Sequence, residues 1–95
     1  MDIQELRQRM DAIDRELVSL YCRRMETARL IGRFKRENNL PVLDSVRELE
    51  LLNRVAEQAG KENEQGIRAL YRLLLDQSRR RQIADGCRDA DPEAD

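Results

Sequence analysis

The feature that most constrains this chain is a long apolar stripe near its N-terminus that one arginine interrupts. The next position of the stripe after Leu20 is Arg24, and Ile31 continues the stripe one heptad further on. A guanidinium keeps its charge and costs several kcal/mol in an apolar seam unless an anion meets it. Arg24 therefore either extends its charged head to solvent or belongs to an anion-binding site. The apolar residues before it follow at alternating steps of three and four, the spacing of one helix face: Ile3, Leu6, Met10, Ile13, Leu17 and Leu20.

The length of this helix predicts that the chain works with a second copy. Asn38 and Asn39, with Pro41 soon after them, are residues that end helices. A helix over residues 3–37 is roughly 50 Å long at 1.5 Å per residue, whereas a compact domain of this size has a radius of gyration of about 12 Å. The helix must project from its own domain, and we expect another copy to cover its stripe in an intertwined homodimer.

Two shorter helices are predicted to follow. Asp44 or Ser45 caps a helix that runs to about residue 59, where Gly60 ends it. A third apolar stripe begins at Ile67, and Gly86 is a natural stop for its helix. The sequence therefore predicts two further amphipathic helices and no strands.

The predicted fold class is all-α, with three helices (long, short and medium) that form an intertwined homodimeric helical bundle. Residues 1–86 form this helical domain, and residues 87–95 have the composition of an acidic, disordered tail. In 95 residues, a charged content of 39% and an aromatic content of 3% leave little material for a self-sufficient core. Composition and helix length thus agree in requiring a partner copy.

The composition also excludes several classes of function. A formal net charge of -1 without aromatic platforms gives no support for nucleic-acid binding, and no apolar run is long enough to cross a membrane, so we expect a cytoplasmic protein. Two cysteines and no histidine make a metal knuckle or a disulfide framework unexpected. The lack of histidine also removes the usual general base, so an enzyme of this kind should catalyse a reaction that needs little proton transfer.

Polar residues interrupt all three predicted stripes. Lys35 follows Arg24 by eleven residues, and eleven steps of about 100° place the two cations within roughly 20° of one direction. Three stripes that turn polar together favour one shared cavity, whose cations suit a small polyanion that also carries a hydroxyl group. The residues concerned are Arg24 and Lys35 in the first helix, Asp44, Arg47 and Glu48 in the second, and Ser78 and Gln82 in the third.

Ordinary structural interpretations exist for the same residues. Ser45 and Glu48 fit an S-x-x-E capping box, and Asp44 fits an N-cap. Ser78 and Gln82 fit an exposed, fraying helix end. The neighbouring run of residues 79–81, three arginines, is interpreted as a solvated helix end whose cations interact favourably with the helix dipole.

With these motifs in place, the sequence resembles the all-helical chorismate mutases, over nearly the whole chain from residue 6 to residue 82. The resemblance implies an intertwined dimer and a substrate that is a small dianion, chorismate. The spaced set of motifs is specific, whereas the tribasic run and the acidic tail depart from it only at the periphery. The set comprises Leu6-Arg7, Ile13-Asp14-Arg15-Glu16-Leu17, Arg23-Arg24, Ile31-Gly32-Arg33-Phe34-Lys35, Leu40-Pro41-Val42-Leu43-Asp44, Arg47-Glu48, and Ser78 with Gln82.

The resemblance implies how the substrate carboxylates are held. Arg24 and Arg47, assisted by Ser78, would bind one of them, and Arg7 of the other subunit would grip the second. The spacing supports this division independently, because Arg7 and Arg24 are seventeen residues apart, or roughly 25 Å along an ideal helix. They cannot hold one small molecule from the same subunit.

The remaining positions carry implied roles at the reacting bond and at the ring. Lys35 and Gln82 would donate hydrogen bonds to the ether oxygen of the breaking bond, and with Arg24 they form the expected catalytic set. Asp44 and Glu48 would orient the ring hydroxyl. The family reaction is a pericyclic [3,3] rearrangement of chorismate to prephenate in the shikimate pathway of aromatic amino-acid biosynthesis, catalysed by an isomerase without metal or cofactor.

Two other functions remain open at this point. Elimination of pyruvate from isochorismate is also pericyclic and uses the same scaffold and charge pattern. A non-catalytic helical dimerisation or regulatory module would need the apolar stripe but not the polar cluster. Assays on the two substrates, and the effect of replacing Arg24, distinguish these possibilities.

Overall fold

The computed structural model describes residues 1–84, which form three helices and no strand. Helix α1 spans Ile3–Glu37, α2 spans Ser45–Ala59 and α3 spans Glu64–Ala84. The expected all-α architecture with a long, a short and a medium helix is confirmed. The expected acidic tail, residues 87–95, lies outside the described residues.

Local side-chain and backbone chemistry sets the helix ends. The Asp2 carboxylate accepts a hydrogen bond from the Glu5 amide at 2.9 Å and caps α1. After α1, Asn39 takes a left-handed conformation with φ of 55°, which reverses the chain into the linker. Asp44 caps α2, and Gly60 ends it with φ of 84°, a value that glycine adopts without steric cost.

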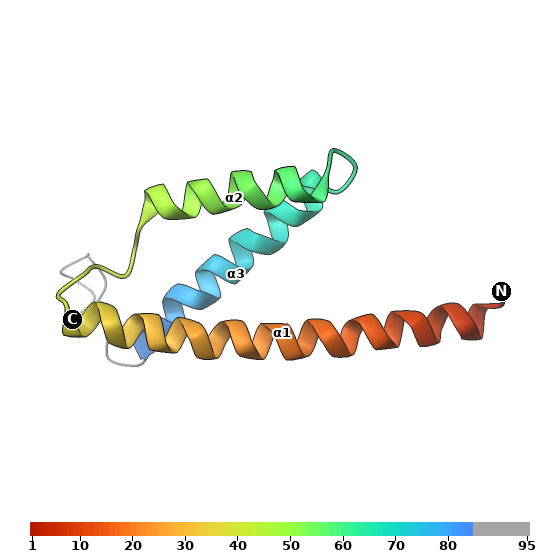
Figure 1. Cartoon of the computed structure of the whole chain (residues 1–95), viewed down its shortest axis with the longest axis horizontal. Helices are drawn as coiled ribbons and strands as arrows, with labels where there is room; N and C mark the ends of the chain where they lie inside the picture. The colour runs from red at the N-terminus through yellow and green to blue at the C-terminus, as the bar shows by residue number, and fades with distance from the viewer. Residues whose placement is uncertain (85–95) are drawn as a thin grey trace.

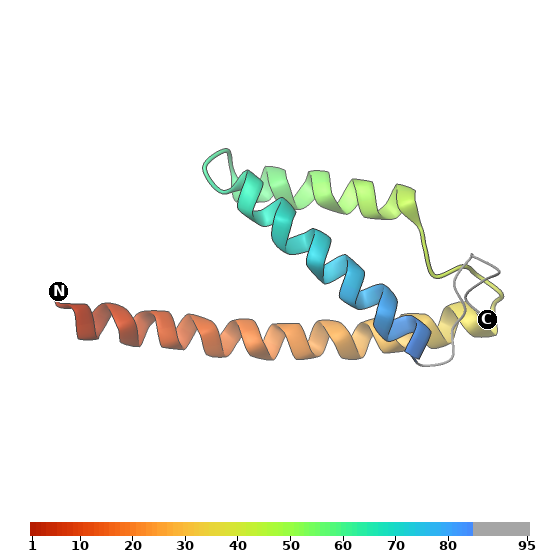
Figure 2. The same cartoon turned by 180° about the vertical axis from the view of Figure 1, so that it is seen from behind.

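Helix α3 holds the structure together. It runs diagonally from the end of α2 to the C-terminal half of α1, and it packs against both helices (Figure 1 and, from behind, Figure 2). No Cα pairs between α1 and α2 lie within 8 Å in the described part of the chain. The core is small and lies along α3. Its buried apolar residues are Met25, Ala28, Val42, Val55, Ala56 and Leu75.

Gly32 sets how closely α3 approaches α1. A Cβ atom built on Gly32 would lie 2.8 Å from the Cα atom of Gln82 and 3.0 Å from its carbonyl oxygen. Only a residue without a side chain allows the two backbones to meet at this distance. The crossing therefore fixes the position of Gln82 of α3 against α1.

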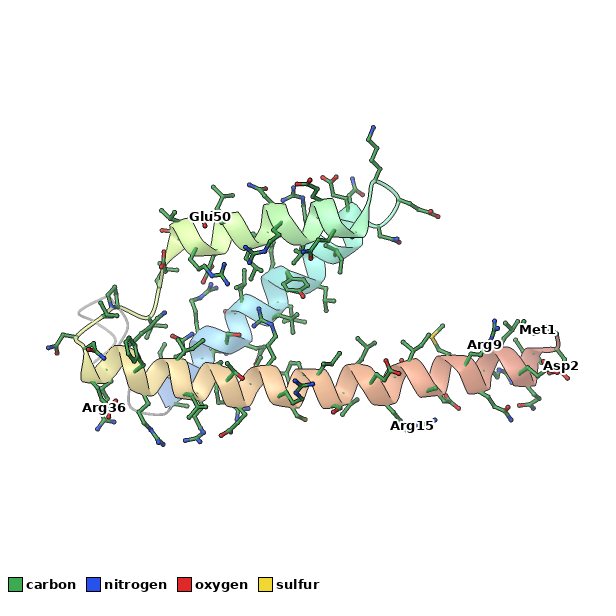
Figure 3. The ribbon with its side chains drawn as sticks, in the orientation of Figure 1. Met1, Asp2, Arg9, Arg15, Arg36 and Glu50 are labelled. Carbon is green, nitrogen blue, oxygen red and sulfur yellow. The ribbon has the colours of Figure 1, made fainter. Side chains whose placement is uncertain are left out.

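The N-terminal half of α1 projects beyond the rest of its own chain (Figure 1). The radius of gyration is 16.5 Å, compared with about 12 Å for a compact domain of this length. Met10, Ile13 and Leu17 are 58%, 52% and 53% exposed, and Figure 3 shows Arg9 and Arg15 on this segment with no other helix beside them. The stripe predicted from the sequence thus lies open to solvent in the single chain.

None of the described helices has the length and apolar character needed to cross a membrane. Glu50, labelled on α2 in Figure 3, is exposed, as are Arg54 and Glu57. Glu48 and Leu51 are residues of α2 that line the site described below.

Candidate active site

The three helices and the linker enclose a cavity of about 340 Å³. Seven of the eight residues predicted for the site line it: Arg24, Lys35, Asp44, Arg47, Glu48, Ser78 and Gln82. The other lining residues are Thr27, Ala28, Ile31, Val42, Leu51, Leu75 and Arg79. The polar interruptions of the three stripes therefore face one common space.

Arg24 is held in place from two sides. Its Nη1 atom donates a hydrogen bond of 2.8 Å to the Oγ atom of Ser78 on α3. Its Cζ atom lies 5.6 Å from the centroid of the Tyr71 ring, a cation–π distance. Ser78 is only 6% exposed, so the contact is well shielded. A guanidinium has five N–H donors, and the bond to Ser78 uses one of them, which leaves others for an anion.

Lys35 is tied to the linker between α1 and α2. Its Nζ atom donates a hydrogen bond of 2.6 Å to the carbonyl oxygen of Val42. Val42 is 2% exposed, so its carbonyl needs this partner inside the protein. The ammonium keeps two further N–H donors for the cavity.

The N-cap residue of α2, Asp44, and the first turn of the helix lie at the cavity. The Oδ1 atom of Asp44 accepts a hydrogen bond of 3.1 Å from the Arg47 amide, and Ser45 is the first helical residue rather than the cap. The capping box considered for Ser45 and Glu48 is therefore wrong. Both carboxylate oxygens of Glu48 instead accept hydrogen bonds from Arg79 across the helix interface.

Gln82 is the most unusual polar group of the site. It is 7% exposed, and its Oε1 atom has no hydrogen-bond partner among the described residues. A buried amide oxygen without a partner is costly, and such groups gather where a ligand or water completes the network. The Oε1 atom of Gln82, an acceptor, is thus open to a hydrogen-bond donor on a molecule that enters the cavity.

The interpretation of residues 79–81 as a solvated helix end is wrong for Arg79. Its side chain lies on the cavity wall with 28% exposure, whereas Arg80 is 72% exposed and bonds to Asp76 on the same helix. Helical periodicity contains the signal, because residue 79 precedes Gln82 by three positions and shares its side of α3. The two arginines that follow residue 79 favour the solvated interpretation for the whole run.

The cavity wall has an excess of positive charge. Its cations are Arg24, Lys35, Arg47 and Arg79, and its carboxylates are Asp44 and Glu48, which leaves a net charge of +2. The described residues contain no group of three or more His, Cys, Asp or Glu side chains that could hold a metal ion. This charge suits a small organic dianion that also presents a hydroxyl group to a carboxylate.

Comparison with known proteins agrees with this chemistry. Residues 6–83 match the model of the family described as chorismate mutase type II. The chain belongs to the chorismate mutase type II family. The resemblance inferred from the sequence motifs is thereby confirmed, and with it the expectation of a domain from an isomerase family.

Two curated relatives contain a similar segment. The T-protein of Haemophilus influenzae is 34% identical over 61 residues, which cover 61% of this chain and 16% of that protein. The 3-dehydroquinate dehydratase of Pyrobaculum aerophilum is 38% identical over 52 residues, which cover 55% of this chain and 17% of that protein. The chorismate mutase type II chain thus spans less than a fifth of the length of either relative. No solved structure matches it.

Arg7 is the one predicted site residue of this chorismate mutase type II chain that is not on the cavity wall. It lies exposed on the projecting half of α1. Seventeen helical residues separate it from Arg24, a distance of roughly 25 Å along the axis. Within one chain, Arg7 cannot reach a molecule that Arg24 binds.

Proposed function

We propose that this chain is a chorismate mutase, which converts chorismate to prephenate by a cofactor-free [3,3] rearrangement in aromatic amino-acid biosynthesis. The observation that carries the proposal is the cavity of a type II family member in which Arg24, Lys35 and Gln82 converge from two helices. The reaction is intramolecular and needs no nucleophile, acid, base or metal. A site that offers oriented hydrogen-bond donors is therefore sufficient for it.

The roles we propose are those that the family resemblance implies, and the contacts of Arg24 and Lys35 on the cavity wall support them. Arg24, with Ser78 beside it, and Arg47 bind one carboxylate of the substrate and fix the compact conformer in which the reacting carbons meet. Lys35 and Gln82 donate to the ether oxygen, which gains negative charge as the bond breaks. Donors that bind the transition state better than the ground state lower the barrier.

The two carboxylates of the wall act on the ring. Asp44 and Glu48 accept hydrogen bonds from the ring hydroxyl and so set which face of the ring lies against α2. Their acceptor capacity exceeds what the protein uses, because Asp44 accepts the Arg47 amide through only one oxygen. The cations of the cavity thus bind the carboxylate of the substrate, and the two carboxylates of the wall bind its hydroxyl group.

The functional unit we propose is an intertwined homodimer. The exposed stripe of α1 supports this arrangement, because a contiguous exposed apolar patch is unusual for a monomer. A second copy would cover the stripe and bring Arg7 of the partner subunit to the second carboxylate. Sedimentation of the purified chain should give the dimer mass, and a monomer at enzymatic concentrations would overturn this arrangement.

The decisive experiment follows the loss of chorismate and the appearance of prephenate with the purified chain, and repeats the assay with isochorismate. We expect turnover of chorismate, and Arg24→Gln should lower the rate by a factor on the order of 10² to 10³ while the helix content stays unchanged. Arg54→Gln, an exposed arginine outside the cavity, is the matched control. Pyruvate released from isochorismate without chorismate turnover would instead identify a lyase.

If neither substrate is turned over and Arg24→Gln only stabilises the fold, the chain is a helical dimerisation module. Replacing a charge in a seam by a neutral residue stabilises a protein when the charge has no function. The cavity gives a reason to expect the opposite result, because Arg24 has partners in Ser78 and Tyr71 and lies on the cavity wall.

A further inference from the structure

An ion pair on the cavity wall joins α3 to α2. The Nη1 atom of Arg79 lies 2.6 Å from each carboxylate oxygen of Glu48. The two side chains are 28% and 22% exposed, so solvent screens this pair less than it screens a pair on the open surface. Both residues line the same cavity.

This pair joins two helices, unlike two other arginine–carboxylate pairs among the described residues. Arg80 with Asp76 and Arg29 with Glu26 join residues three or four positions apart on one helix. Arg79 and Glu48 are 31 residues apart and come from different helices. The Nη2 atom of Arg79 also lies 3.7 Å from the Oδ1 atom of Asp76 on its own helix, which is an ion-pair distance but longer than a hydrogen bond. The short contact of Arg79 is therefore the one with Glu48.

We propose that Arg79 is a positioning residue that fixes the Glu48 carboxylate as a hydrogen-bond acceptor facing the cavity. The proposal rests on the proposed function, in which Glu48 receives the ring hydroxyl of the substrate. A carboxylate has about four lone-pair sites, and Arg79 occupies one on each oxygen. The remaining sites are open to a hydroxyl donor.

The positive charge of Arg79 also favours binding of the substrate beside Glu48. An uncompensated carboxylate on the wall would repel a dianionic substrate, and the adjacent guanidinium offsets that repulsion. Arg79 does not need to bind a substrate carboxylate itself, because Arg24 and Arg47 line the cavity as well. Its contribution to catalysis passes through Glu48.

The test compares Arg79→Gln with Arg80→Gln, which removes the same charge one position away on the solvent side of α3. We expect kcat/KM for chorismate to fall by a factor on the order of 10 to 100 in Arg79→Gln, the effect of losing one oriented hydrogen bond to a charged group. Arg80→Gln should stay within about twofold of the unaltered chain, since exposed pairs contribute little. Arg79→Lys, which keeps the charge but not the planar guanidinium, should lie between them.

A double-mutant cycle separates positioning from mere structural support. In the Glu48→Gln background, Arg79→Gln should change kcat/KM by less than about threefold, because the group it positions is already absent. In this background Arg79→Lys should also change kcat/KM by less than about threefold. Arg79→Lys replaces Arg79→Gln in the test if Arg79→Gln does not fold. Equal losses in both backgrounds, or full activity of Arg79→Gln, would overturn the role of Arg79 alone. Absence of chorismate turnover by the unaltered chain would overturn the proposed function itself, and the role of Arg79 with it.

Discussion

The close crossing of α1 and α3 makes Gly32→Ala the most informative single substitution in this chain. The added Cβ atom would lie 2.8 Å from the Cα atom of Gln82, about 0.6 Å closer than the 3.4 Å at which ordinary contacts begin. The contacted atoms are the Cα, carbonyl oxygen and Cβ atoms of Gln82, which move only with the backbone of α3, so rotation of a side chain cannot relieve the contact. The two helices must separate, and Gln82 must move with α3.

The expected cost can be estimated from two opposing effects. Overpacking a tight contact destabilises a protein by about 1–3 kcal/mol. Alanine gains about 0.5–1 kcal/mol over glycine within a helix. The net loss of stability is therefore about 0–2.5 kcal/mol, and each kcal/mol lowers the Tm of a domain this size by roughly 4–8 °C.

Two other glycines provide matched controls. Gly66 lies in α3 with no atom within 4 Å of an added Cβ, so Gly66→Ala should keep or raise the Tm. Gly60 has equally open space but a φ of +84°, so Gly60→Ala should cost about 1–2 kcal/mol through backbone strain alone. Neither glycine lines the cavity, and both variants should keep the kcat of the unaltered chain.

The assay combines thermal unfolding, followed by circular dichroism, with chorismate turnover. Protein concentration must be the same in all samples, because self-association makes the Tm depend on concentration. Gly32→Ala should be the one variant of the three that lowers both Tm and kcat. A Gly32→Ala protein that unfolds no earlier than Gly66→Ala and keeps full kcat would refute the close crossing as the feature that positions Gln82.

Two further predictions address the donors of the site. Gln82→Glu should be more active at pH 5 than at pH 8, because the introduced carboxyl donates a hydrogen bond only while it is protonated; equal rates at both pH values would contradict the role of Gln82 as a donor. Mixing inactive Arg7→Ala and Arg24→Ala chains should restore part of the activity, because each mixed dimer contains one intact site. Failure to recover activity after mass spectrometry of the native complex has confirmed subunit exchange would contradict a shared site.

Local chemistry explains why the helices could be predicted from the sequence. The spacing of Ile13, Leu17 and Leu20 matches the period of a helix and not that of a strand. Asn39 adopts the left-handed conformation that ends α1. Asp44 has a short polar side chain at the start of an apolar stripe, which is sufficient to cap α2. Each of these signals lies within a few residues of the structure that it determines.

The parts that could not be predicted depend on contacts between distant segments. The partner of Lys35 is the carbonyl oxygen of Val42, and every residue carries such a group, so no side-chain pattern reveals it. The role of Gly32 depends on Gln82, 50 positions later in the sequence. The position of Arg79 depends on Glu48, which lies on another helix, whereas the two arginines that follow it in the sequence favour a common solvated surface.

The bond from Lys35 to Val42 also has an entropic consequence. A free lysine side chain has about 2 kcal/mol of rotamer entropy, which a ligand would have to remove if it captured a mobile ammonium. In this chain the Lys35 ammonium donates a hydrogen bond of 2.6 Å to the carbonyl oxygen of Val42, and this bond fixes the ammonium when the chain folds. Its conformational freedom is lost once, during folding, and is not lost again at each binding event. By holding Lys35 in place, the linker between α1 and α2 therefore lowers the entropic cost of binding each anion.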